Sequence, residues 1–232
     1  MNALLGMLYR LAMPFQRMFL RRRVKRLSLE TLDGLSLVVL PDVFNGIVFR
    51  TGALLSRTVA SFPPSHLAAA GEPDALDMGT GSGVGALFAA RMGYRVTAVD
   101  VNPEAVRCAR ANALLNHLEE RVEILEGDLF APVAGRTFDL VLFNPPFFGG
   151  VPRDLHDLSW RGADVFPRFL AALPAALRID GLALVVLSTH GDAEGQAKLL
   201  LSSPSFSVRP VVVRHFGNET LTVYAVRHAA AG

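Results

Sequence analysis

The chain has 232 residues and a mass of 25.0 kDa, which is enough for one well-buried α/β domain but too small for a second full domain. Residues 1–26 hold 7 of the 23 arginines and lysines and no acid, so the rest of the chain is mildly acidic, with 16 basic side chains against 21 acidic ones. This balance argues against a generic nucleic-acid-binding body, which would be basic.

The cysteine and histidine content narrows the chemistry further. Cys108 is the single cysteine, so the chain cannot form an internal disulfide, and a reducing, cytoplasmic compartment is expected. The six histidines are scattered along the chain without the spacing of metal ligands. We therefore expect no metal cofactor.

Residues 1–30 are predicted to form a basic amphipathic arm. Apolar side chains recur at helical spacing, with arginines on roughly the opposite side; the apolar positions are Leu4, Leu8, Leu11, Phe15 and Met18. Charge follows the apolar stretch, unlike in a signal peptide, and Arg10 and Arg17 interrupt any run that could span a membrane. Residues 1–26 are thus interpreted in one of three ways. They could contact a membrane surface, RNA or another polyanion, or a protein; they could form a lid over the site; or they could form a helix packed on the body.

From residue 31 onward, apolar strands alternate with helical stretches. The lead-in segment, residues 31–70, predicts a strand at 35–40 and a helix at about 51–60. Buried parallel strands are then expected at 75–78, 95–99, 122–125, 140–143 and 183–187, with helices at 84–91, 103–116 and 165–177. Two final strands, 207–214 and 220–226, flank a Gly-Asn turn, as in an antiparallel hairpin. The sequence therefore predicts an α/β fold with a Rossmann-like, seven-stranded, mostly parallel sheet, a C-terminal hairpin and helices on both faces.

A glycine-rich turn opens the helix after the first parallel strand. In Asp77-Met78-Gly79-Thr80-Gly81-Ser82-Gly83, the glycines permit positive φ and let a ligand approach the backbone. Asp100 ends the second parallel strand, where a carboxylate can accept from both hydroxyls of an adenosine ribose. Asp128 follows the third strand and is placed to accept from an adenine amino group. Because the carboxyl ends of parallel strands share one edge of the sheet, these elements predict a nucleoside cofactor.

Asn144-Pro145-Pro146-Phe147 follows the fourth parallel strand at the same edge. The Asn144 carboxamide oxygen and the Pro145 carbonyl are two acceptors without competing backbone donors, since proline has no N–H. Two acceptors suit an NH2 group, and Phe147 offers a flat face on which the planar group carrying that nitrogen could stack. The tetrapeptide therefore predicts a clamp for a planar amide or aromatic amine. The alternative is a proline-rich turn with Phe147 in the core.

Together these motifs resemble a known family. A nicotinamide dehydrogenase would account for the glycines and Asp100, but not for Asp77, Gly127-Asp128-Leu129-Phe130 or the prolines. The Asp77-x-Gly-x-Gly-x-Gly spacing resembles motif I of class I S-adenosylmethionine methyltransferases. With the Asn-Pro-Pro-Phe motif, residues 35–190 resemble the small-domain N-methyltransferases typified by the HemK-type glutamine methyltransferases and their RNA adenine-N6 relatives.

The resemblance implies S-adenosyl-L-methionine as cofactor and one methyltransferase domain over residues 31–232. It implies a set of cofactor-binding residues, which are Asp77, Gly79, Gly81, Gly83, Asp100, Asp128, Leu129 and Asn144. It implies a catalytic set, which is Asn144, Pro145 and Phe147. Candidate substrate residues are Phe44, Arg50 and Thr51 in the lead-in segment and Trp160 and Arg161 after the clamp, with simple packing as the alternative for the aromatic ones.

Two departures from the family pattern leave the methyl acceptor open. Phe147 stands where glutamine methyltransferases usually carry tyrosine, and the basic arm has no counterpart in the family. We favour a protein glutamine side chain, because Trp160-Arg161-Gly162-Ala163-Asp164 is also similar to a compact branch of glutamine methyltransferases. RNA adenine-N6 methylation fits Phe147 and the basic arm. Small-molecule N-methylation and a non-catalytic methyltransferase-like binding module are further alternatives.

Overall fold

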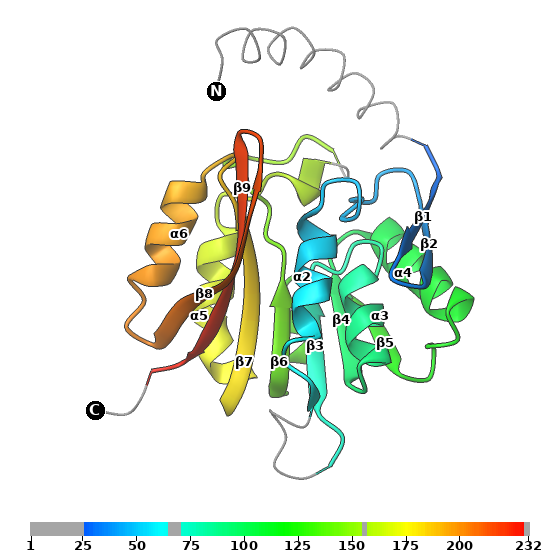
Figure 1. The fold of residues 1–232 in the computed structure, drawn as a ribbon, viewed down its shortest axis with the longest axis horizontal. Helices are drawn as coiled ribbons and strands as arrows, with labels where there is room; N and C mark the ends of the chain where they lie inside the picture. Colours follow the sequence, from blue (N-terminus) through cyan, green and yellow to red (C-terminus); the bar gives the residue numbers. More distant parts are fainter. Residues whose placement is uncertain (1–25, 65–70, 155–156, 230–232) are drawn as a thin grey trace, which may run out of the picture.

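A seven-stranded sheet forms the centre of the protein, in a computed structural model that describes residues 26–64, 71–154 and 157–229 (Figure 1). Its strands are β3 (Asp74–Met78), β4 (Arg95–Asp100), β5 (Val122–Glu126), β6 (Phe138–Phe143), β7 (Leu177–Ser188), β8 (Phe206–Phe216) and β9 (Glu219–His228). They are ordered β5-β4-β3-β6-β7-β9-β8. Strands β3 to β7 pair in parallel, and β9 pairs antiparallel with both β7 and β8. The predicted sheet, with its C-terminal hairpin, is confirmed.

Helices cover both faces of this sheet (Figure 1). Helices α2 (Thr51–Val59), α3 (Val84–Arg91) and α4 (Pro103–Leu115) contribute to one hydrophobic cluster, and α5 (Val165–Ala176) and α6 (Ala193–Leu201) contribute to a second. Two short 3-10 helices, Ala131–Val133 and Asp157–Ser159, lie in loops. All six residues of β6 are buried, as its continuous apolar sequence between two helical layers requires. The strand ends are thereby fixed in position, which makes the carboxyl edge a rigid platform for a site.

The lead-in segment forms a separate two-stranded sheet. Strand β2 (Leu35–Val39) is the expected one, whereas β1 (Ser28–Leu32), which pairs with it antiparallel, was not expected. Strand β1 therefore crosses the boundary placed at residue 30 between arm and domain. Asp33 and Gly34 form the turn with φ of 47° and 88°. An Asp-Gly pair between alternating runs is the signal that would have revealed this hairpin.

Buried asparagines fasten the lead-in segment to the body. Asn112 of α4 accepts from Val38 N at 2.8 Å through Oδ1, and its Nδ2 donates to Val38 O at 2.7 Å and to Ser82 O at 2.8 Å. Since Ser82 lies in the glycine-rich turn, one amide ties β2, α4 and that turn together. Asn102 adds a second tie, because its Nδ2 donates to Asp42 O at 2.9 Å. The lead-in segment is thus held at the carboxyl edge of the sheet.

Two further points separate the structure from the sequence prediction. Helix α6 was not predicted, because nine residues with Gly195 among them give a weak helical signal. Residues 1–25 lie outside the described residues, so the amphipathic helix and the contacts expected for residues 1–26 stay predictions. Within the described ranges, no helix is long and apolar enough to cross a membrane.

Candidate active site

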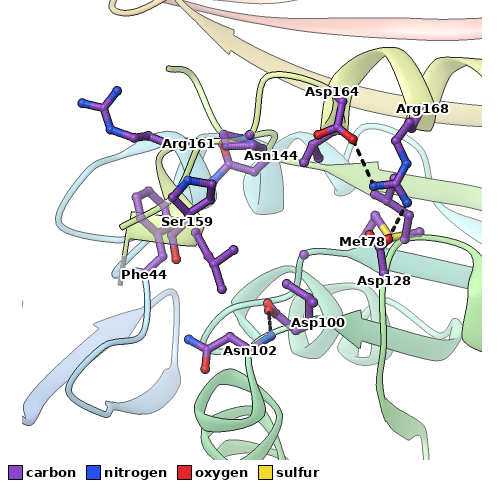
Figure 2. Close-up of a pocket in the computed structure, with 18 of the residues that line it drawn as sticks. Phe44, Met78, Asp100, Asn102, Asp128, Asn144, Ser159, Arg161, Asp164 and Arg168 are labelled. Atoms are coloured by element: carbon purple, nitrogen blue, oxygen red, sulfur yellow. Dashed lines mark hydrogen bonds and ion pairs between the residues drawn. The ribbon is translucent and has the colours of Figure 1, made fainter. Parts of the chain in front are cut away.

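A cavity of about 510 Å³ opens at the carboxyl ends of β3, β4, β5 and β6 (Figure 2). Met78, Asp100 and Asn144 line it from three strand ends, and Asp128 lines it from the loop after β5. Its outer wall comes from residues 150–152, 158, 159 and 161–165, which precede and begin α5. A cavity of this volume suits a small-molecule cofactor. Tertiary structure thus brings together most of the elements that the sequence placed at one sheet edge.

The glycine-rich turn between β3 and α3 forms one wall of the cavity. Gly79, Gly81 and Gly83 have φ of 65°, 55° and 84°, a region that glycine enters without steric cost. A Cβ on Gly83 would also lie 3.1 Å from the Cβ of Ala109 in α4. Gly79 and Gly81 line the cavity, whereas Gly83 ends the turn as the N-cap of α3. The first two glycines are therefore placed for direct contact with a ligand, and the third is required by the turn itself.

Asp77 holds this turn from inside the protein. Its carboxylate accepts from Thr80 Oγ1 at 2.6 Å and from Ala86 N at 2.8 Å. Burial raises the pKa of the Asp77 carboxyl to about 6. Asp77 does not line the large cavity, so its observed contacts are those of a residue that organises the turn. Direct contact of Asp77 with the cofactor stays a prediction.

Asp100 lines the cavity and braces the glycine-rich turn. Its Oδ2 accepts from Gly81 N at 2.8 Å, and its Oδ1 accepts from Asn102 N at 2.9 Å. Burial raises the pKa of the Asp100 carboxyl. A carboxylate offers about four lone-pair sites, so the Asp100 carboxylate retains capacity to accept from a ligand hydroxyl. The predicted role of Asp100 as ribose partner stays a prediction that this position in the cavity allows.

Asp128 lies in the cavity wall and is already paired (Figure 2). Arg168 of α5 donates Nη2 to Asp128 Oδ2, while its Nη1 lies 3.5 Å from Asp164 Oδ2. The hydrogen bond that Arg168 donates to the Asp128 carboxylate raises the pKa of the Arg168 guanidinium. Leu129, with φ of 47°, lines the cavity beside Asp128. Arg168 was not among the residues predicted from the sequence, and its i,i+4 spacing from Asp164 is the signal that could have indicated it.

Asn144 presents a buried acceptor with no partner. Its Nδ2 donates to Thr51 Oγ1 at 3.1 Å, at the first residue of α2. Its Oδ1 is buried and makes no hydrogen bond. Leaving a buried acceptor unpaired costs about 1–3 kcal/mol, so such an atom calls for an explanation. Because Asn144 lines the cavity, a ligand N–H is the natural partner of this oxygen.

The rest of the clamp motif differs from the prediction. Pro145 and Phe147 are buried and do not line the cavity, whereas Pro146 does. The backbone O of Phe147 accepts from Asp192 N at 2.7 Å, and a Cβ on Gly191 would meet Phe147 at 2.1 Å. The loop before α6 therefore packs against the backbone of Phe147, and the residue is 5% exposed. Stacking of this ring on the methyl acceptor is not supported, and core packing describes it better.

Aromatic packing accounts for part of the predicted substrate set. Phe44 lines the cavity, as expected, and its ring stacks on Phe49 with centroids 5.3 Å apart. Trp160 does not line the cavity; its ring meets Phe44 and Phe49 edge-on, with centroids 5.0 and 4.6 Å away. Trp160 thus packs against the ring of Phe44 without lining the cavity. This packing corrects the assignment of Trp160 as a direct substrate residue.

Arg50 also departs from the prediction. It precedes α2 with φ of 66°, and it does not line the cavity. Its guanidinium instead lies 4.7 Å from the ring centroid of Phe216, at the end of β8. A cation–π contact with the C-terminal hairpin therefore takes the place of the expected substrate contact.

Arg161 lines the cavity and is fixed in its outer wall. Its Nη1 donates to Gly149 O at 3.0 Å, and its Nε lies 3.3 Å from Asp157 Oδ2. Asp157 also accepts from Arg153 Nε at 2.9 Å, and hydrogen bonding from Arg153 lowers the pKa of Asp157 to about 2. The sequence indicated Arg161 but not Asp157, because the wall exists only once the segment folds back on itself.

The fold and the cavity define a Rossmann-like class I methyltransferase. The glycine turn, two carboxylates and an unpaired amide oxygen fit an adenosine-type cofactor beside a nitrogen acceptor. In the described part of the chain, no cluster of acids, histidines or cysteines could hold a metal.

A family model then identifies the particular family. The model described as "Methyltransferase small domain" matches residues 59–203, which is more than half of the chain. The protein therefore belongs to the methyltransferase small domain family. This finding confirms the resemblance carried by the motifs.

Similar proteins include enzymes named for both protein and RNA substrates. The chain is 38% identical over 111 residues to a ribosomal RNA small subunit methyltransferase C of Alcanivorax borkumensis, covering 48% of this chain and 31% of that protein. It is 33% identical over 173 residues to a release factor glutamine methyltransferase of Chlorobaculum tepidum, covering 66% and 58%. The chain thus spans about a third to three fifths of the length of these two relatives.

A solved structure shares the fold. It is a T. thermophilus 16S rRNA N2 G1207 methyltransferase in complex with AdoMet and guanosine, with a TM-score of 0.64 and 21% identity. The match covers 88% of this chain and 50% of that one. That protein holds the cofactor predicted here, S-adenosyl-L-methionine.

Proposed function

We propose that this protein is an S-adenosylmethionine-dependent N-methyltransferase that acts on a planar amide or amino nitrogen, with a protein glutamine side chain as acceptor. The unpaired Oδ1 of Asn144 carries the proposal. An acceptor NH2 that donates to this oxygen would satisfy it and would hold the nitrogen at the cavity. Gly79, Gly81, Asp100 and Asp128 would hold the cofactor.

Asn144 contributes to the reaction by positioning the acceptor nitrogen. When bound, S-adenosylmethionine supplies an electrophilic methyl group, so an N–C bond forms as the C–S bond breaks. An amide nitrogen is a poor nucleophile, because its lone pair is delocalised. An N–H donated to Asn144 Oδ1 would favour a pyramidal nitrogen with its lone pair directed at the methyl. Pro145 does not line the cavity, so its carbonyl as acceptor of the second N–H stays a prediction from the sequence. The proton leaves to solvent after transfer, so no general base is needed.

Thr51→Val is expected to lower kcat about three- to tenfold with little change in cofactor affinity. Thr51 Oγ1 accepts from Asn144 Nδ2, so it decides which end of the amide is left for the acceptor. Valine keeps the volume but removes a bond worth about 0.5–1.5 kcal/mol. Steady-state kinetics and calorimetric titration with S-adenosylmethionine measure the two effects.

Thr58→Val is the matched control for this variant. Thr58 is also buried in α2, but its hydroxyl donates to Leu54 O within the helix. Its kcat should stay at the wild-type value. Equal kcat in both variants would show that Thr51 does not position the amide.

The acceptor class is supported by two observations. The body of the chain is acidic, which disfavours RNA, and one relative is named a glutamine methyltransferase. The second candidate is an exocyclic amine of RNA, which is favoured by the relative named for ribosomal RNA and by the guanosine bound in the similar structure. Both acceptors present a planar NH2 to the same oxygen.

Transfer of label separates these candidates. The protein is incubated with methyl-labelled S-adenosylmethionine and with protein, RNA and small-molecule fractions of a cell extract. Label is expected in protein. Acid hydrolysis of that fraction should release volatile labelled methylamine, because hydrolysis of an N-methylated glutamine amide frees methylamine. Label in RNA would establish the second candidate and reject glutamine.

The inactive control for this experiment is Asn144→Ala, which keeps the cofactor cavity. Label that persists with this variant would come from a contaminating enzyme. If wild type binds S-adenosylmethionine but labels no fraction, the chain is a binding module and the proposal of catalysis is wrong.

A further inference from the structure

A second cavity, of about 260 Å³, lies next to the clamp motif. Phe148 and Gly149 line it from the segment after the motif, and the start of α5 and helix α6 complete it. Gly162 and Ala163 line both this cavity and the larger one, so the two are neighbours with a common wall. Nothing in the proposed reaction uses this second cavity.

Gln196 of α6 gives the second cavity a buried acceptor. The side chain lines the cavity, and the residue is 8% exposed. Its Nε2 donates to Pro146 O at 2.8 Å, while its Oε1 is buried and has no hydrogen-bond partner. Across residues 26–64, 71–154 and 157–229, Asn144 Oδ1 and Gln196 Oε1 are the two buried side-chain polar atoms in this state. Each lines one of the two neighbouring cavities.

The chemistry of the lining indicates what would bind there. Apolar surface is provided by Phe148, Phe166, Pro167 and Leu199. A single acceptor next to apolar walls fits a peptide backbone N–H and the apolar side chain beside it, as in other peptide-binding grooves.

Charges near the second cavity favour a polypeptide over a nucleic acid. Asp192 lines the cavity, and Glu194 follows it in the first turn of α6, so two carboxylates repel a phosphate there. Lys198 is the cation on α6. Arg161 reaches Gly149 in the cavity lining, but Asp157 pairs with its guanidinium.

We propose that the second cavity binds the residue next to the methylated glutamine in a polypeptide substrate. The backbone N–H of that residue donates to Gln196 Oε1, and its side chain packs on Phe148 and Leu199. This inference rests on the proposed function and adds the form of the substrate. Binding there is coupled to the clamp, because Gln196 Nε2 holds Pro146 O.

The test compares peptides with a single residue as acceptors. The probes are acetylated, amidated tripeptides with a central glutamine and apolar neighbours, and acetylglutamine dimethylamide, which lacks the backbone N–H of a following residue. Wild type should methylate the best tripeptide with kcat/KM at least about tenfold above the single residue, the gain from one added pocket contact. Leu199→Trp, which fills the cavity from an exposed position, should abolish this gain and leave the single residue unaffected.

Leu201→Trp is the matched control, since Leu201 is an exposed leucine of the same helix that does not line the cavity. It should keep the tripeptide preference. If Leu199→Trp still prefers the tripeptide, the inference about the second cavity is wrong, but the proposed function is not affected. If wild type binds S-adenosylmethionine but methylates neither probe, or methylates RNA, the glutamine acceptor is wrong and the inference fails with it.

Discussion

Asn144→Ala is expected to reduce turnover by about 10²–10³-fold, which is the usual cost of removing one preorganised polar group from the reacting centre. The reason is that Asn144 Oδ1 is the buried, unpartnered acceptor at the cavity. Affinity for S-adenosylmethionine should stay near the wild-type value, because the glycine turn, Asp100 and Asp128 are untouched. Methyl-transfer kinetics and calorimetric titration measure the two quantities.

The melting temperature of Asn144→Ala and a control variant distinguish a loss of positioning from a loss of folding. The alanine loses one hydrogen bond, to Thr51, but removes an unpaired buried oxygen, so the melting temperature should change little. Asn116→Ala removes an amide that bonds Ser36 and Asn112 and does not line the cavity, and it should retain turnover. Unimpaired turnover in Asn144→Ala would reject the clamp.

Asp100→Ala is expected to weaken S-adenosylmethionine binding by about tenfold to a hundredfold, since hydrogen bonds to a charged group contribute about 1.5–3 kcal/mol. Two causes add together. The ligand loses its predicted ribose partner, and Gly81 N loses the carboxylate that orders the glycine turn. Calorimetric titration gives the dissociation constant directly.

The pH dependence of cofactor affinity and a control variant separate the ribose-binding role of Asp100 from a general effect of removing a negative charge. Because burial raises the pKa of the Asp100 carboxyl, wild-type affinity should fall as the pH falls through that raised pKa, where protonation removes an acceptor. Glu104→Ala removes a carboxylate paired with Arg107 outside the cavity and should leave affinity unchanged. Unchanged affinity in Asp100→Ala would remove its assigned role.

The position of a site residue could be predicted from the sequence where it depends only on neighbouring residues along the chain. Asp100 ends one buried apolar strand and Asn144 follows another. Because parallel strands end at one edge of the sheet, the order along the chain was enough to predict that these residues converge. The glycine turn is equally local, because positive φ at Gly79 and Gly81 requires glycine.

Contacts between distant segments were not foreseeable in this way. Arg168 pairs with Asp128 from α5, and Gln196 reaches Pro146 from a helix that the pattern did not predict. Phe147 shows the same limit. The ring is buried outside the cavity, and its backbone is bonded by the loop before α6, which no spacing in the sequence indicates.

The sequence by itself determined the α/β class, the order of strands and helices from residue 35 onward except α6, the resemblance to the methyltransferase family and the placement of Asp100 and Asn144 at one sheet edge. These properties depend on hydrophobic periodicity, glycine at positive φ and the placement of strand ends, all of which are set by neighbours along the chain. The tertiary structure alone decided that Asn144 keeps a free oxygen while Thr51 holds its other end, and that Gln196 lies behind Pro146. Those facts depend on packing between segments far apart in sequence, where burial selects which polar atoms find partners.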